Sequence, residues 1–195
     1  MASPAPERTR VFIAIALEPA LAKEVRKVQQ RLNSPEGVVR WSNPEHLHLT
    51  LQFLGNVAIE HLDDLAAALR GACARTAPFR LALQGAGCFP NTKSPRVVWL
   101  GVQGDLEPLQ KLQRQIANAT SSFGDHGDER TFQPHLTIGR VKPSGIEARK
   151  AGQTIALATV PKLGDWTVNQ VLLVRSELSS DGARYATLAA VALVP

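Results

Sequence analysis

The sequence predicts an α+β fold: a bilobal, pseudo-twofold arrangement of antiparallel sheets with helices packed outside and a central cleft between the lobes. Three observations predict this class. Segments with alternating apolar and polar residues are interspersed with segments of helical periodicity. Neighbouring strand segments are joined by short turns of the kind that antiparallel hairpins use. The tetrapeptide His48–Leu51 recurs almost unchanged as His135–Ile138, each time after a helix and a turn, which indicates one such unit in each lobe.

The N-terminal part of the chain predicts a strand, a helix and a second, short strand. Residues 1–9 have no apolar run and are expected to form a disordered tail. Residues 11–17 are an aliphatic run rich in β-branched side chains, which favours a buried strand. A proline opens the helix predicted at 19–32, and the Asn-Ser-Pro-Glu-Gly run at 33–37 ends it. A short strand is predicted at 38–41.

The first histidine strand is predicted at 47–55, where apolar and polar residues alternate up to a glycine. Residues 60–75 carry leucines at helical spacing, which favours an amphipathic helix. The alternating segment 79–89 and the aliphatic segment 96–102 are predicted as strands, joined by a loop at 90–95 that begins and ends with proline.

The C-terminal part continues the same alternation of helices and strands. A helix is predicted at 106–123, followed by a Gly-rich polar loop and the second histidine strand at 132–140. A weaker helix is expected at 146–157. Two final strands are predicted at 166–178 and 184–193, joined by a Ser-Ser-Asp-Gly turn.

Length and composition are those of one ordinary domain. With 195 residues, 44% hydrophobic and 20% charged, the chain can bury a core, and we expect a single bilobal domain over 1–195. The net charge of +5 makes phosphate-bearing partners plausible without identifying one. No segment resembles a signal peptide or a membrane span, so we expect a cytoplasmic protein that binds no membrane. Nothing in the sequence signals an obligate oligomer, and we expect a monomer.

The two cysteines, Cys73 and Cys88, form no CxxC motif. Cys73 lies on the apolar side of a predicted helix, and Cys88 lies near the end of a predicted strand. Free, buried thiols are therefore expected at both positions.

The histidine motifs are the candidate catalytic residues. Because strand side chains alternate between faces, His48 shares a face with Thr50, and His135 shares a face with Thr137. In both motifs this face lies opposite the apolar one. A lone histidine on a strand is usually a solvated or structural side chain. The duplicated pattern instead favours two imidazoles that transfer protons on either side of one reacting group.

This residue set suits displacement at phosphorus. Two histidines can act as general base and general acid because an imidazole has an unperturbed pKa near 6.5. Each such proton transfer typically contributes a factor of about 10²–10⁴ in rate. A threonine hydroxyl can donate to a non-bridging phosphate oxygen, where negative charge accumulates in the transition state. Neither a covalent nucleophile nor a metal is required, and we expect no cofactor.

The chain resembles the two-histidine phosphoesterase superfamily, and within it the RNA 2′,3′-cyclic phosphodiesterases, also called 2′-5′ RNA ligase-like proteins. The resemblance covers nearly the whole chain. The segments that carry it are 10–15 (RVFIAI), 41–55 (WSNPEHLHLTLQFLG), 87–90 (GCFP), 95–101 (PRVVWLG), 132–140 (FQPHLTIGR), 176–178 (SEL), Gly182 and Tyr185.

The resemblance implies a bilobal fold and hydrolysis of a terminal 2′,3′-cyclic phosphate of RNA or of a nucleotide to the 2′-phosphomonoester. It implies that His48 donates a proton to the departing 3′ oxygen and that His135 accepts a proton from the attacking water. Thr50 and Thr137 would hold the phosphate. The same groups would support 2′-5′ ligation as a reverse reaction.

Two further residues are weaker candidates for the site. His46 would share a strand face with His48 and could contact the substrate at the edge of the cleft. The pair could also suggest a metal site, but no carboxylate or further His motif completes one, so we expect no metal. Arg140 closes the second motif and could bind phosphate through its guanidinium or form a structural ion pair.

Four aromatic residues are candidates for stacking on a nucleobase, although aromatic residues at strand positions are more often core. They are Phe12, Trp41, Phe53 and Phe132. Two alternatives to RNA-end hydrolysis stay open. The protein could hydrolyse a small cyclic nucleotide, or it could bind RNA ends without turnover.

Overall fold

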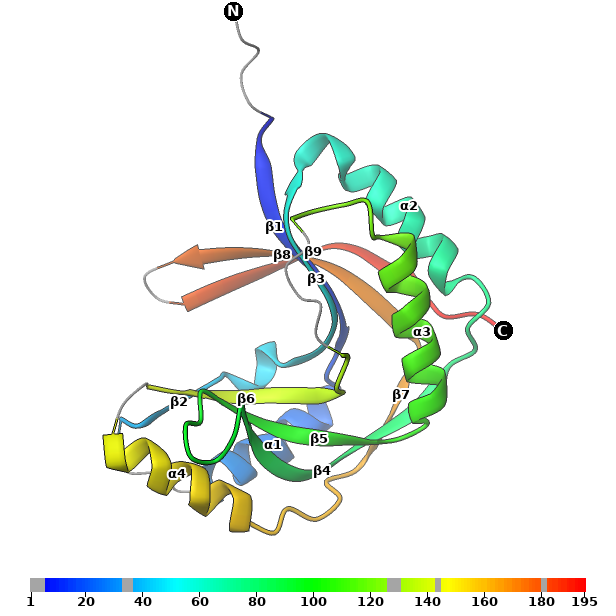
Figure 1. Ribbon diagram of the computed structural model, residues 1–195. Coiled ribbons are helices and arrows are strands. Elements are labelled where there is room, and N and C mark those ends of the chain that lie inside the picture. Colours follow the sequence, from blue (N-terminus) through cyan, green and yellow to red (C-terminus); the bar gives the residue numbers. More distant parts are fainter. Residues whose placement is uncertain (1–5, 33–36, 126–130, 143–144, 180–181) are drawn as a thin grey trace, which may run out of the picture.

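The computed structural model describes residues 6–32, 37–125, 131–142, 145–179 and 182–195. These residues form two curled antiparallel sheets with α-helices on their outer sides (Figure 1). The α+β, bilobal class predicted from the sequence is therefore confirmed.

The first sheet has four strands in the order β3-β1-β8-β9. Their bounds are β1 (Arg8–Ala16), β3 (His48–Ala58), β8 (Gln170–Ser179) and β9 (Gly182–Ala192). The second sheet has five strands in the order β2-β6-β5-β4-β7. Their bounds are β2 (Val39–Trp41), β4 (Phe79–Phe89), β5 (Val97–Gly104), β6 (His135–Val141) and β7 (Asp165–Val168).

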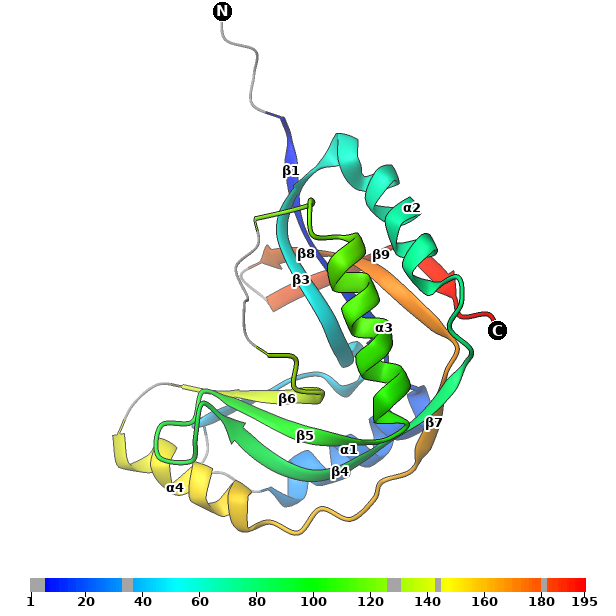
Figure 2. The ribbon, with the colours of Figure 1, turned by 45° about the vertical axis from the view of Figure 1, so that its right-hand side comes forward.

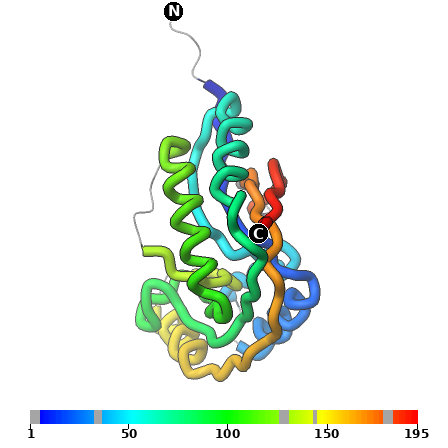
Figure 3. The backbone as a smooth tube through the Cα atoms, turned by 90° about the vertical axis from the view of Figure 1, so that its right-hand side faces the viewer, coloured from blue at the N-terminus to red at the C-terminus, as the bar shows by residue number. Residues whose placement is uncertain are grey.

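The helices cover the outer faces of both sheets (Figures 1 and 2). Their bounds are α1 (Pro19–Arg31), α2 (Leu62–Cys73), α3 (Leu106–Ala119) and α4 (Gly145–Leu157). Helices α2 and α3 lie side by side against the four-stranded sheet (Figure 3), where α2 contacts β9 and α3 contacts β3. Helix α4 contacts β4, and α1 lies beneath β6 in the five-stranded sheet. The other faces of the two sheets, called the inner faces below, are turned toward each other.

The repeated unit is strand, helix, histidine strand. In the first copy, β1 and α1 precede β3, and β3 pairs antiparallel with β1. In the second copy, β5 and α3 precede β6, and β6 pairs antiparallel with β5. The helix of each copy packs on the sheet that contains the strands of the other copy: α1 packs on β6 of the five-stranded sheet, and α3 packs on β3 of the four-stranded sheet. One hydrophobic core therefore runs through both lobes.

Three of the predicted boundaries are wrong in ways that have a physical reason. The strand predicted at 166–178 is two strands, because the chain passes from one sheet to the other at Asn169, between β7 and β8. The tail predicted over 1–9 is too long, because β1 already begins at Arg8; residues 1–5 lie outside the described residues. The helix predicted to reach 123 ends at Ala119, where the buried Thr120 hydroxyl donates to the Ile116 carbonyl oxygen.

The two cysteines are free and buried, as predicted. Burial raises the pKa of Cys73 and of Cys88 to about 11, because an apolar surrounding disfavours a thiolate. Within the described part of the chain, no helix is both long and apolar enough to cross a membrane.

Candidate active site

The two histidines stand at the first position of β3 and of β6. These strands belong to different sheets and contact each other. Leu49 and Leu136, which directly follow the histidines, are buried in the common core. The half-buried His48 and His135 therefore lie on the inner faces, as the alternation predicted.

Both imidazoles are held by the same local hydrogen bond. Nδ1 of His48 donates to the carbonyl oxygen of His46 at 3.1 Å, and Nδ1 of His135 donates to the carbonyl oxygen of Gln133 at 2.7 Å. A carbonyl oxygen can only accept, so each Nδ1 carries a hydrogen. The nitrogen left to exchange a proton is Nε2 in both rings. In each motif the residue two positions upstream thus fixes the tautomer.

Aromatic rings surround His48. The Phe12 ring, from β1, is stacked on the imidazole with centroids 4.6 Å apart and planes at 26°. The Tyr185 ring, from β9, meets the imidazole edge-on at 5.3 Å and 88°. Burial lowers the pKa of His48, and the hydrogen bond to the His46 carbonyl, which favours the charged form, opposes this only in part. His48 is thereby made a stronger acid.

His135 has a more open aromatic environment. The Phe89 ring, at the end of β4, meets the imidazole edge-on at 4.9 Å and 86°. Phe89 in turn leans on Trp99 of β5, with ring centroids 5.3 Å apart. Among the described residues no ring stacks face-to-face on His135, so the two imidazoles of the repeat have different surroundings.

Thr50 and Thr137 are half-buried and lie on the inner faces beside their histidines. Their flanking residues on the same strands, Leu51 and Leu136, are core. Within the described part of the chain, neither threonine hydroxyl takes part in a side-chain hydrogen bond. Both hydroxyls are therefore available to a ligand.

Arg140 lies five positions after His135, near the end of β6, and is exposed. It belongs to the same strand as Thr137 but not to the immediate surroundings of the histidine rings. Its neighbour across the sheet is Arg40 of β2. No ion pair of Arg140 occurs among the described residues, which disfavours the structural alternative considered for it.

The prediction that His46 shares a strand face with His48 is wrong. His46 ends the 3₁₀ helix η1 (Pro44–His46), which the Asn43 side chain caps by accepting from the Glu45 amide. Its exposed side chain therefore follows no strand alternation, and its carbonyl oxygen accepts the hydrogen bond from His48 Nδ1. No group of three or more metal-ligating side chains occurs within the described residues.

The four candidate stacking residues separate into two pairs. Trp41 and Phe132 are only partly exposed and pack against the main core. Phe12 is 3% exposed and is occupied by its stack on His48. The alternation of Leu47, Leu49 and Leu51 predicts that Phe53 lies on the apolar side of its strand, but Phe53 is 45% exposed and its ring centroid lies 5.9 Å from that of Phe12. Register shifts between β1 and β3 account for this, and Leu54 is buried in its place.

Sequence reasoning did not single out Gln29, a 7% exposed residue of α1. Its Nε2 donates to the Ser42 carbonyl oxygen at 2.8 Å and to the Ile138 carbonyl oxygen at 2.9 Å. The Ser42 amide also donates to Ile138, at 3.0 Å. Gln29 thus ties the segment before the first motif to the strand of the second. A glutamine on the apolar side of a helix was the only available signal.

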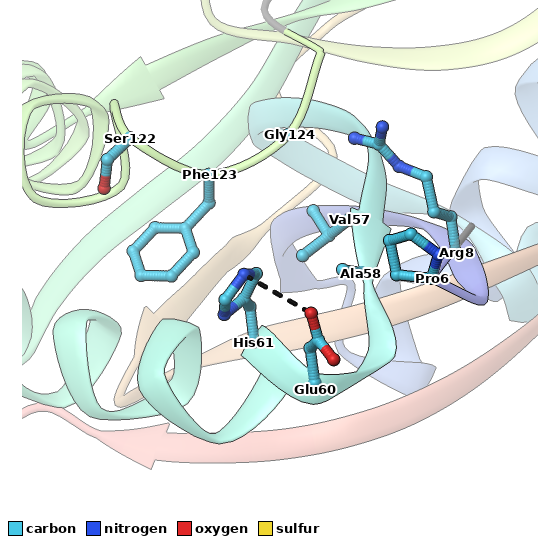
Figure 4. A pocket seen from close by; sticks show the side chains of 9 residues that line it. All are labelled: Pro6, Arg8, Val57, Ala58, Glu60, His61, Ser122, Phe123 and Gly124. Carbon is cyan, nitrogen blue, oxygen red and sulfur yellow. Dashed lines mark ion pairs between the residues drawn. The ribbon is translucent and has the colours of Figure 1, made fainter. Parts of the chain in front are cut away.

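A hollow of about 280 Å³ lies away from this site (Figure 4). It is found at the far end of β3, since β1 pairs Ala16 with His48 but Arg8 with Ala58. Its lining includes Arg8, Phe123 and His61, whose Nε2 lies 4.0 Å from a Glu60 carboxylate oxygen. It therefore holds neither histidine motif.

Comparisons with known proteins agree with the geometry. A family model described as the 2′-5′ RNA ligase superfamily matches residues 17–179. The RNA 2′,3′-cyclic phosphodiesterase of Methanothermobacter thermautotrophicus is 36% identical over 179 residues, which cover 91% of this chain and 95% of that protein. The protein of the same name from Archaeoglobus fulgidus is 32% identical, over 92% of this chain and 97% of its own.

A solved structure adds the fold. The crystal structure of E. coli LigT complexed with 3′-AMP superposes on this chain with a TM-score of 0.77 at 27% sequence identity. The match covers 97% of this chain and 100% of the LigT chain. The family match spans most of the chain and includes both histidine motifs. This chain belongs to the 2′-5′ RNA ligase superfamily, the two-histidine phosphoesterases.

Proposed function

We propose that this protein hydrolyses the 2′,3′-cyclic phosphate at the end of an RNA to a 2′-phosphomonoester. The observation that carries the proposal is the matched pair of imidazoles, each with Nδ1 bound to the carbonyl two residues upstream and Nε2 left for proton transfer. Relatives that share up to 36% of their residues with the chain bear the name of this activity.

The reaction balances with two histidines and water. His135 accepts a proton from water through Nε2 as the water oxygen bonds to phosphorus. The bond between phosphorus and the 3′ oxygen breaks, and His48 gives its Nε2 proton to that oxygen. The products are a 3′ hydroxyl and a 2′-phosphomonoester. The two rings end in exchanged protonation states and are restored by solvent.

The assignment of His48 as the acid has an electrostatic argument. Burial lowers its pKa in the free protein, so its protonated form gives up the proton readily. A bound cyclic phosphate carries a negative charge, and a nearby negative charge favours imidazolium. Substrate binding therefore charges His48 at the moment at which an acid is needed.

Thr50 and Thr137 donate their hydroxyl hydrogens to the non-bridging phosphate oxygens. Both lie beside a catalytic imidazole and lack a protein partner within the described residues. These oxygens gain negative charge in the transition state, where a fixed donor contributes most. Arg140 lies farther along β6 and is not assigned to the reacting phosphate.

The experiment is hydrolysis of an RNA oligonucleotide with a 2′,3′-cyclic phosphate end, with the product identified by ³¹P NMR. The wild type is expected to give the 2′-phosphomonoester in the presence of a metal chelator. His48→Ala and His135→Ala are each expected to lower the rate by at least about 10²-fold. A wild type that binds such ends but turns over no cyclic phosphate would favour the binding protein without catalysis.

The superfamily's name gives a second activity, 2′-5′ ligation, in which a 5′-hydroxyl RNA end attacks the cyclic phosphate in place of water. The proton transfers run in the same direction as in hydrolysis: His135 accepts the proton of the 5′ hydroxyl, and His48 protonates the departing 3′ oxygen, which leaves a 2′-5′ phosphodiester and a 3′ hydroxyl. It is tested by incubating the protein with cyclic-phosphate and 5′-hydroxyl ends together, and we expect hydrolysis to exceed ligation. We also propose that the protein acts as a monomer in the cytoplasm, which size-exclusion chromatography and cell fractionation test.

A further inference from the structure

Two arginines face each other across neighbouring strands of the five-stranded sheet. The antiparallel pairing of β2 with β6 makes Arg40 and Arg140 direct partners, flanked by the pairs Val39–Val141 and Trp41–Gly139. Both arginines are exposed. Side chains that are direct cross-strand partners lie close enough to interact, and two like charges in such a pair destabilise the sheet.

Both arginines lie on the inner face. Val39 is core and Trp41 packs against the core, so strand alternation turns Arg40 to the opposite side. On β6, Val141 is core, and a Cβ at Gly139 would meet the Trp41 ring and the Val39 side chain. Arg140, between them, therefore lies on the inner face. The register shift between β5 and β6 leaves Ile138 as an extra residue in β6, so Arg140 shares the inner face with His135 and Thr137 although three positions separate it from Thr137.

The charge of this pair is not balanced within the described part of the chain, where no ion pair or side-chain hydrogen bond involves either guanidinium. An anion bound between the two arginines would offset the repulsion between their charges and would accept charge-assisted hydrogen bonds from both guanidinium groups. Arginine binds phosphate well because its planar donors can make two parallel bonds to the oxygens.

We propose that Arg40 and Arg140 form a second phosphate site, which binds a backbone phosphate of the RNA upstream of the cyclic end. The proposal rests on the proposed function and names its substrate class. Arg140 lies three positions, about 10 Å along the strand, from Thr137, which holds the reacting phosphate. Because arginine side chains are long and flexible, the two guanidinium groups can reach along the inner face toward Thr137. They can thereby come within reach of the phosphate of the neighbouring nucleotide.

The consequence is a preference for chain ends over mononucleotides. A cyclic mononucleotide carries only the reacting phosphate and leaves the arginine pair empty. A dinucleotide or longer RNA fills both sites. The net charge of +5 acts in the same direction but without specificity.

The test compares kcat/KM for adenosine 2′,3′-cyclic phosphate with kcat/KM for a dinucleotide that ends in the same group. Arg40→Gln is expected to lower the ratio of dinucleotide to mononucleotide by about tenfold, the effect of one hydrogen bond to a charged group. For longer RNA it should reduce the slope of log kcat/KM against log salt by about 1. Arg149→Gln, an exposed arginine on the outer helix α4, is the matched control and should leave the ratio as in the wild type.

A second probe needs no variant. A dinucleotide with an uncharged methylphosphonate linkage should be turned over by the wild type about tenfold less efficiently than its phosphodiester counterpart. Equal efficiencies, or an unchanged ratio in Arg40→Gln, would overturn the second phosphate site while the proposed function stands. Failure of the wild type to hydrolyse any of these substrates would instead overturn the proposed function.

Discussion

Replacing Gln29 by leucine tests how the segment before the first histidine strand is held to the second histidine strand. Gln29 donates both amide hydrogens, to the carbonyl oxygens of Ser42 and Ile138. Leucine has a similar size but no donor, so the half-buried Ser42 carbonyl loses this partner, while the Ile138 carbonyl keeps the Ser42 amide. Leaving a buried acceptor unsatisfied costs about 1–3 kcal/mol. With the second bond weakened, we expect a loss of about 2–3 kcal/mol in the free energy of unfolding.

The assay is urea and thermal denaturation followed by tryptophan fluorescence. For a chain of this length, a loss of this size lowers Tm by about 4–12 °C. Gln30→Leu is the matched control, because Gln30 is the next residue of the same helix and is exposed. It should change Tm by no more than about 2 °C, since surface substitutions usually stay within about 0.5 kcal/mol.

Activity separates a positioning role of Gln29 from a merely structural one. At a temperature where Gln29→Leu is fully folded, we expect kcat to fall by about tenfold or more, because misplacement of catalytic groups is costly. KM should change less. A variant as stable and as active as Gln30→Leu would refute the reasoning that the buried amide sets the spacing of the motifs.

Three further predictions follow from the site and the core. The lowered pKa of His48 places the alkaline limb of the pH profile of kcat/KM below the ordinary histidine range, because the acid must be protonated. Phe12→Leu exposes the His48 ring to solvent and should move the alkaline limb to higher pH. Movement of the acid limb in this variant would instead make His48 the base. Thr137→Val should lower kcat/KM by about 10²-fold with little loss of stability, and a value near that of the wild type would remove the threonine from the phosphate. The thiols of Cys73 and Cys88 should resist iodoacetamide at pH 8 until the protein is unfolded in urea, and rapid labelling of the folded protein would contradict their burial.

Local patterns predicted the elements that carry the site. The alternation around His48 and His135 predicted which faces they occupy, because strand periodicity depends only on neighbouring residues. The duplicated motif also predicted two related units. The histidine tautomers follow from backbone carbonyls two residues away, so they too are local.

Contacts between distant segments were not predictable in this way. Gln29 binds a residue that lies far from it in the sequence, Ile138, and the periodicity of a helix does not indicate which distant residue a side chain will contact. The chain passes from one sheet to the other at Asn169 without a break in the alternation of apolar and polar residues. The sequence therefore predicts one strand where the structure has two, β7 and β8. Phe53 changes face through register shifts that depend on the partner strand β1. Each miss arises from tertiary pairing and not from local propensity.

A sulfur atom in place of the 3′ oxygen of the cyclic phosphate gives the most direct measurement of the paired roles. A thiolate leaves without protonation far more readily than an alkoxide, since thiols have a pKa of about 8.5. We predict that His48→Ala hydrolyses this substrate at close to the wild-type rate, while His135→Ala stays inactive because water still needs a base. Rescue of His135→Ala in place of His48→Ala would reverse the roles, and rescue of neither would contradict acid–base catalysis by the pair.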